Sequence, residues 1–106
     1  MAFAITEENF KKEVLESTLP VVMKVYAVWC GPCQHMVPVF EAVAKANQGK
    51  AKFVELNVDQ ARELAIQFGI TSVPTTIFIK NGTVVGKELG YIGQQELQER
   101  IDRFFA

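Results

Sequence analysis

A nearly continuous apolar segment, followed at once by two cysteines and a helical pattern, restricts the fold more than any other feature of this sequence. Residues 21–27, Val-Val-Met-Lys-Val-Tyr-Ala, are apolar on both faces of an extended chain apart from one lysine. Such strands lie in the interior of sheets that are at least partly parallel. The pattern that begins at Gly31 places Met36, Phe40 and Val43 on one helix face. The chain is therefore expected to have an α/β fold.

The rest of the chain alternates between strand and helix patterns. Asn81-Gly82 lies between two alternating segments and is the strongest short-range signal for a β-hairpin. The other predicted elements are a short strand at 2–5, a helix capped by Thr6 that ends before Pro20, a strand at 52–58, a short helix capped by Asp59, strands at 76–79 and 83–89, and a last helix that contains Leu97, Ile101 and Phe104. This order implies a mixed sheet covered by helices.

Size and composition are typical of one globular domain. The chain has 106 residues, 49% of them hydrophobic, and we expect residues 1–106 to form a single domain. The net charge is −1 and the basic residues are scattered, which argues against nucleic-acid binding. No apolar run approaches the roughly 20 residues that span a bilayer, and the N-terminus turns acidic before a signal peptide develops. We expect a cytoplasmic protein that does not bind membranes.

The two cysteines of the chain lie in Cys30-Gly31-Pro32-Cys33, where the apolar strand meets the helix. Residues i and i+3 of a helix are roughly 5 Å apart at Cα, within the range that a disulfide requires. Unpaired N–H groups and the dipole of the first helical turn stabilise a thiolate on Cys30. We therefore expect a pair that cycles between dithiol and disulfide, in which Cys30 attacks a target disulfide and Cys33 resolves the mixed disulfide.

Other uses of two cysteines fit this sequence less well. Two buried core thiols would not need a Gly-Pro insert at a strand–helix junction. A zinc site needs four ligands, and His35 is the one further candidate. A c-type haem requires histidine directly after the second cysteine, where this chain has Gln34. An iron–sulfur cluster shared by two chains stays open as an alternative. We expect no metal ligands.

The segment Trp29-Cys30-Gly31-Pro32-Cys33 resembles the active-site signature of the thioredoxin family, and the order of elements fits that family along essentially the whole chain. Ser72-Val73-Pro74-Thr75 resembles the family loop whose proline is cis and faces the cysteines. Asn81-Gly82 matches the family hairpin, and Gly90 matches the glycine beside the substrate groove. The resemblance implies a thioredoxin fold, in which a central mixed five-stranded sheet is flanked by four helices.

The resemblance also implies an activity, the reduction of protein disulfides. Electrons would come from NADPH through a flavoprotein thioredoxin reductase, no cofactor would be tightly bound, and the protein would act as a monomer on disulfide-containing proteins. The implied support and docking residues are Trp29, Gly31, Pro32, Val73, Pro74, Thr75, Gly90 and Tyr91. Tyr91 is larger than the residue usual at its position and would narrow the groove. Two alternatives stay open: a specialised oxidase or isomerase with a raised potential, and a binding module in a partner complex.

Two charged residues depart from the family pattern. Thioredoxins carry a buried aspartate on the strand before Trp-Cys and a lysine on the neighbouring strand, and the corresponding positions here are Lys24 and Glu55. An unpaired buried lysine costs several kcal/mol or loses its proton. We therefore expect Lys24 and Glu55 to form a pair beneath Cys33 that supports the active site. The alternative is that Lys24 reaches the surface and Glu55 is solvated.

Overall fold

The computed structural model describes residues 2–106, which alternate between strands and helices. The elements are β1 (Phe3–Ala4), η1 (Lys11–Leu15), β2 (Val21–Tyr26), α1 (Gly31–Ala46), β3 (Lys52–Asn57), α2 (Arg62–Gln67), β4 (Thr75–Lys80), β5 (Thr83–Leu89) and α3 (Gln94–Phe104). Each predicted element is present, and most bounds differ from the prediction by one or two residues.

Strand β2 lies in the middle of the sheet. Among the described residues the strand order is β1-β3-β2-β4-β5. β2 is parallel to β3 and antiparallel to β4, while β1 is parallel to β3 and β5 is antiparallel to β4. The prediction of a mixed five-stranded sheet is confirmed, and so is the interior position of the apolar segment, whose residues 21–25 are all buried.

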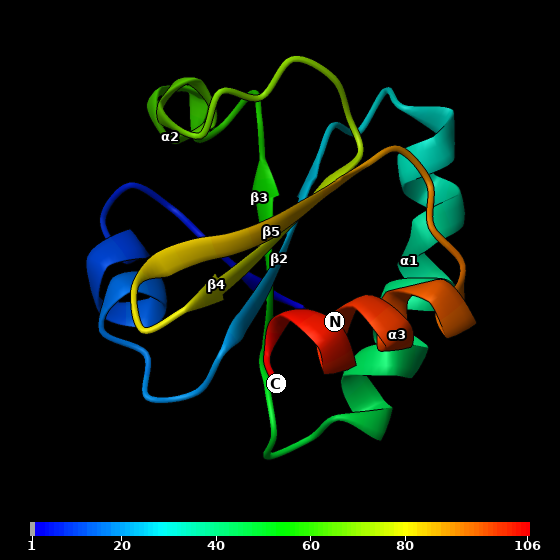
Figure 1. The fold of residues 1–106 in the computed structure, drawn as a ribbon. Coiled ribbons are helices and arrows are strands. Elements are labelled where there is room, and N and C mark those ends of the chain that lie inside the picture. The colour runs from blue at the N-terminus through cyan, green and yellow to red at the C-terminus, as the bar shows by residue number, and fades with distance from the viewer. Residues whose placement is uncertain (1) are drawn as a thin grey trace.

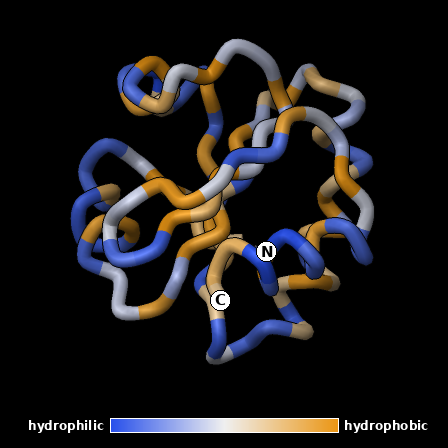
Figure 2. Tube along the Cα trace, in the orientation of Figure 1, coloured by the Kyte–Doolittle hydropathy of each residue, from blue (hydrophilic) through white to orange (hydrophobic). Residues whose placement is uncertain are grey.

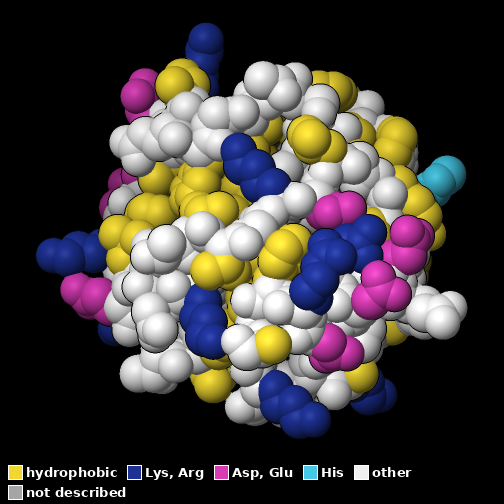
Figure 3. Space-filling model, in the orientation of Figure 1, with side chains coloured by type: hydrophobic (Ala, Val, Ile, Leu, Met, Phe, Trp, Pro, Cys, Tyr) yellow, Lys and Arg dark blue, Asp and Glu magenta, His cyan; other side chains and the backbone are white. Residues whose placement is uncertain are grey.

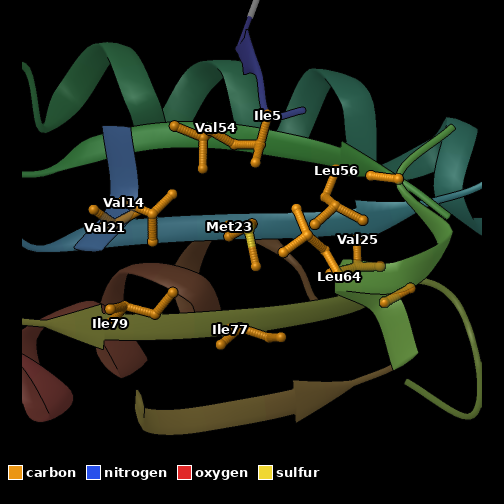
Figure 4. Packing of buried hydrophobic residues seen from close by; sticks show 12 residues of the cluster. Ile5, Val14, Val21, Met23, Val25, Val54, Leu56, Leu64, Ile77 and Ile79 are labelled. Atoms are coloured by element: carbon orange, nitrogen blue, oxygen red, sulfur yellow. The ribbon is translucent and has the colours of Figure 1, made fainter. Parts of the chain in front are cut away.

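Helices cover both faces of this sheet (Figure 1). η1 and α2 pack on one face, over a core that includes Val14, Met23 and Leu64. Figure 4 shows the strand residues of that core pointing to the same side of the sheet. α1 and α3 cover the other face, over a core that includes Phe40 and Phe78. Figure 2 shows the hydrophobic residues concentrated along the central strands, as burial on both faces requires.

The predicted hairpin is confirmed in detail. Asn81 and Gly82 both have positive φ, 53° and 76°, as a two-residue turn between twisted antiparallel strands requires. Asparagine and glycine are the residues that adopt this conformation most readily. The turn joins β4 to β5 and so sets the register of the sheet edge.

Two local predictions about helix starts need correction. Asp59 does not cap α2, which begins after Ala61 with no side-chain cap. The first helix is a short π-helical segment, η1, which ends at Leu15, before Pro20 as predicted, but begins after Phe10 with no side-chain cap. Thr6 instead closes the turn that precedes η1, because its hydroxyl accepts the N–H of Asn9 while the Asn9 amide oxygen accepts the N–H of Thr6.

Candidate active site

Cys30 and Cys33 form a disulfide at the end of β2, where α1 begins. Their Cα atoms are 5.3 Å apart, which the three-residue spacing at a helix start provides. Cys30 is the residue before the helix, and its Sγ accepts the backbone N–H of Cys33 at 3.2 Å. The two cysteines therefore have the geometry that a reversible redox pair at a helix N-terminus requires. The same N–H is positioned to stabilise a Cys30 thiolate after reduction.

The loop that directly precedes β4 lies at the same end of the sheet and approaches the disulfide. The Val73–Pro74 peptide bond is cis, as the resemblance implied. The carbonyl oxygen of Val73 lies 3.6 Å from Cys30 Sγ. The N–H of Gly90 donates to the Pro74 carbonyl at 2.8 Å, so these expected docking residues are brought together. Gly90 has φ of +85°, a conformation that favours glycine.

Thr75 and Tyr91 are placed differently from the other expected docking residues. The Thr75 side chain is 1% exposed, and its hydroxyl donates to the Ser72 carbonyl at 2.8 Å. It therefore holds the loop together and is not available at the surface. Tyr91 is 54% exposed, but it does not line the cleft beside Trp29. Its expected effect on the width of the groove stays a prediction.

Trp29 lies on the surface directly before the disulfide. Its side chain is 70% exposed, yet its indole Nε1 donates to Asp59 Oδ2 at 3.0 Å. Asp59 follows β3, so this hydrogen bond joins the ends of two neighbouring parallel strands. Sequence analysis assigned Asp59 to a helix cap and missed this role. The signal that could have indicated it is the position of both residues just beyond the carboxyl ends of strands that pair in parallel.

Lys24 and Glu55 face each other across β2 and β3. The predicted pair is present: Lys24 Nζ lies 3.9 Å from Glu55 Oε1, and the Lys24 side chain is only 4% exposed. The Lys24 ammonium also lies 5.0 Å from the centre of the Phe40 ring and 5.5 Å from that of Tyr26. Both rings offer negative π-faces to the cation. The alternative in which Lys24 reaches the surface is wrong.

Tyr26 connects this pair with the cysteines. Its ring packs against the cluster that contains Cys30 and Cys33, and with Cys33 it lines a small cavity of about 150 Å³. Burial raises the pKa of Tyr26, and the carboxylate of Glu55 raises it further. A charge change on Glu55 therefore acts on a side chain that contacts the redox pair.

Burial lowers the pKa of Lys24 below its ordinary value of 10.5. The carboxylates of Glu55 and Glu41 offset part of this lowering. The cause is desolvation, because the ammonium has exchanged water for a low-dielectric core and one carboxylate at ion-pair distance. Lys24 is thus a buried titratable group on the sheet face covered by α1 and α3.

Within residues 2–106, no group of three or more His, Cys, Asp or Glu side chains is arranged to hold a metal ion. The same residues contain no helix of the length and hydropathy that crossing a bilayer requires.

Comparison with known proteins places the chain among its relatives. The sequence model described as Thioredoxin matches residues 1–103. The chain belongs to the thioredoxin family. It is 37% identical over 103 residues to the thioredoxin of Rickettsia felis, covering 97% of this chain and 98% of that protein. It is 40% identical over 100 residues to the thioredoxin of Chlorobaculum thiosulfatiphilum, covering 94% and 93%. For the thioredoxin of Haemophilus influenzae the identity is 36% over 99 residues, covering 93% and 92%.

Membership of the thioredoxin family and the Cys30–Cys33 pair together identify the activity. The protein is a thiol–disulfide oxidoreductase that acts through this redox-active disulfide. As a member of the thioredoxin family it interacts with disulfide substrates and needs no tightly bound cofactor. Lys24 and Glu55 form an ion pair between the neighbouring strands β2 and β3.

Proposed function

We propose that the protein, acting as a monomer and a single domain, reduces disulfides of other proteins in two steps. The thiolate of Cys30 attacks one sulfur of the substrate disulfide and forms a mixed disulfide, and the released substrate thiolate takes up a proton. Cys33 then loses its proton and attacks Cys30 Sγ, which forms the Cys30–Cys33 disulfide and releases the second substrate thiolate. Two electrons and two protons pass from the dithiol to the substrate.

We assign substrate docking to the surface around the disulfide, made of Trp29, Gly31, Pro32, Val73, Pro74 and Gly90. Gly31 and Pro32 are exposed, and Trp29 is the most exposed large apolar side chain of the described chain. The N–H of Val73 donates to no other described residue. An extended substrate segment can pair with that backbone, which gives recognition without strict side-chain selection.

Lys24 and Glu55 are assigned a supporting role in proton transfer. Cys33 is 2% exposed, so its proton does not leave directly to bulk water. Glu55 is the more exposed member of the pair and reaches the cysteines through Tyr26. A charged Lys24 favours the thiolate state, while a neutral Lys24 can accept a proton. Both groups therefore influence the ionisation of Cys33.

Electrons for the next cycle are proposed to come from NADPH through a flavoprotein thioredoxin reductase, in the cytoplasm. Two cysteines in one reactive pair suit a reducing compartment, where disulfides are catalytic more often than structural. The test is reduction of the isolated disulfide form by NADPH and a purified bacterial thioredoxin reductase. Consumption of NADPH that depends on Cys30 supports this route, and its absence contradicts it.

The observation that carries the reductase proposal is the buried disulfide at a helix N-terminus beside an exposed Trp29. With dithiothreitol as donor, the wild type should accelerate reduction of a disulfide-bonded reporter such as insulin. Cys30→Ser should abolish the acceleration, and Cys33→Ser should accumulate a mixed disulfide with the reporter. His35→Ser, an exposed change on the same helix, is the control and should keep full activity. Equal rates for wild type and Cys30→Ser would contradict the proposal.

An oxidising role is the second candidate, and the buried ammonium of Lys24 is the observation that favours it. A positive charge near the cysteines stabilises the reduced form and raises the reduction potential. The reduction potential distinguishes the reductase from the oxidase or isomerase. It is measured by equilibrating the protein in glutathione buffers and reading the redox state of the cysteine pair from Trp29 fluorescence. A potential well below the glutathione poise supports the reductase, and one at or above it supports the oxidase or isomerase.

A further inference from the structure

A cleft of about 520 Å³ extends the docking surface from Trp29 toward α2. Its walls come from the Trp29 loop, from α2 and from the loop at residues 70–73. Ile66, on α2, lines this cleft and is 62% exposed, which is high for a large aliphatic side chain. Ile70 and Val73 line it from the opposite loop. The cleft thus has exposed apolar walls that adjoin the disulfide.

Arg62 supplies a free positive charge at the same cleft. It precedes Ile66 by one helical turn, so both side chains project from the same side of α2. No described residue forms an ion pair or a hydrogen bond with the Arg62 guanidinium. Figure 3 shows a basic side chain projecting over α2, with a hydrophobic and an acidic side chain beside it.

The acidic groups near Arg62 do not neutralise it directly. Asp59 lines the cleft, but its carboxylate accepts the indole N–H of Trp29 at 3.0 Å. Glu63 is the next residue along α2, about 100° around the helix, and is not among the cleft residues. Glu7 accepts the backbone N–H of Glu63 at 3.2 Å. The cleft therefore carries one cation, Arg62, and one carboxylate, Asp59, and neither forms an ion pair with a described residue.

Three backbone N–H groups beside the cleft are also without a partner among the described residues. The N–H groups of Thr71, Ser72 and Val73 donate to no other described residue. Thr71 and Ser72 are exposed and Val73 is half-buried. This segment can therefore pair with an extended chain that lies along the cleft.

We propose that this cleft selects protein substrates in which an acidic and an apolar side chain accompany the target cysteine within one extended segment. The segment pairs with the backbone at Val73, its apolar side chain contacts Ile66 and Ile70, and its carboxylate binds Arg62. The inference specifies the substrates of the proposed reductase and rests on that function.

The test uses peptides with one cysteine in a mixed disulfide with thionitrobenzoate, so that attack by Cys30 releases a coloured thiolate. Matched peptides carry Glu, Gln or Lys two residues before or two residues after the cysteine. Rates are compared for wild type, Arg62→Glu and Lys50→Glu. Lys50 is an exposed residue that precedes β3, whereas the cleft lies beyond the opposite end of that strand, so Lys50→Glu controls for the same change in net charge.

Wild type and Lys50→Glu should reduce the Glu peptide about two- to fivefold faster than the Lys peptide in at least one of the two placements, as expected for one exposed ion pair. Arg62→Glu should reverse the order, and high salt should remove the preference because the pair is solvent-exposed. Equal rates for all peptides would overturn the inference while leaving the reductase function intact. A preference of the wild type for lysine would also overturn it and show that Asp59 dominates the charge of the cleft.

A second variant tests the apolar wall. Ile66→Ser should slow reduction of a peptide with leucine near the cysteine by about two- to fivefold relative to the same peptide with serine, since about 0.8 kcal/mol accompanies each buried CH₂. An unchanged ratio would overturn the role of Ile66. If no peptide is reduced faster by wild type than by Cys30→Ser, the proposed function itself fails, and the substrate inference fails with it.

Discussion

Lys24 and Glu55 are unequal partners: their charged atoms lie 3.9 Å apart, but the lysine side chain is 4% exposed and the glutamate side chain 17%. The glutamate also interacts with Tyr26 and keeps some contact with solvent. The Lys24 ammonium lies near the faces of two aromatic rings, and within the described chain Glu55 supplies the carboxylate at ion-pair distance. The ammonium therefore depends on the pair more than the carboxylate does.

This asymmetry predicts that removing the charge of Glu55 lowers the free energy of unfolding more than removing the charge of Lys24 does. Glu55→Gln leaves a buried ammonium without its ion-pair partner and should lower the free energy of unfolding by about 2–4 kcal/mol. Lys24→Met removes the more deeply buried charge and should cost less than about 1 kcal/mol. Urea unfolding at neutral pH measures both. Glu16→Gln, in the exposed pair with Lys11, is the control and should change stability by less than about 0.5 kcal/mol. An equal or larger loss for Lys24→Met would contradict the asymmetry.

The lowered pKa of Lys24 predicts that stability rises with pH. Between that lowered pKa and the ordinary value of 10.5, the unfolded chain binds one more proton than the folded chain. The free energy of unfolding therefore increases through this window, by about 1.4 kcal/mol in total for each unit of lowering. Urea unfolding of the disulfide form at a series of pH values that rise from neutral to 10.5 should show the increase, and Lys24→Met should remove it. Parallel curves for the two proteins would contradict burial as the cause.

The charge of Lys24 should also affect the thiols. If the ammonium stabilises thiolate in the reduced protein, Lys24→Met raises a cysteine pKa and lowers the reduction potential, by roughly 30 mV for each 1.4 kcal/mol. Thiolate absorbance as a function of pH, together with glutathione equilibration, measures both quantities. Lys11→Met, which alters an exposed lysine on η1, is the control. An unchanged thiol titration in Lys24→Met would contradict stabilisation of the thiolate by the Lys24 ammonium.

Gly90 should be intolerant of substitution because of its backbone. An added Cβ meets no atom within 4 Å, but φ is +85°. Gly90→Ala should therefore cost about 1–2 kcal/mol of stability. Gly90→Asn should cost less, because asparagine tolerates this conformation. Equal losses for Ala and Asn, measured by urea unfolding, would show that the backbone conformation is not the reason.

Local sequence patterns predicted the features whose structure is set by residues adjacent in the chain. The hairpin followed from Asn81-Gly82, whose residue types set the turn geometry. The disulfide followed from the i, i+3 spacing of Cys30 and Cys33 at a helix start. The pairing of Lys24 with Glu55 was instead predicted from the resemblance to the thioredoxin family, and the cost of an unpaired charge on an interior strand supported it.

Other residues found partners that no local pattern specifies. Asp59 has the residue type of a helix cap, yet its carboxylate binds Trp29, thirty residues earlier in the chain. Thr75 follows the loop proline, but strand pairing buries its side chain. Arg62 and Ile66 carry no motif and become a candidate binding surface only because α2 faces the 70–73 loop across a cleft.

The sequence by itself therefore determined the fold class, the redox pair and the family, because spacing, turn chemistry and hydrophobic pattern act over a few residues. The tertiary structure decided that Trp29 meets Asp59 and that Arg62 has no partner within residues 2–106. The physical reason is that hydrogen bonds and ion pairs depend on distances of a few ångströms between side chains. Only the packing of strands and helices sets those distances for residues far apart in the chain.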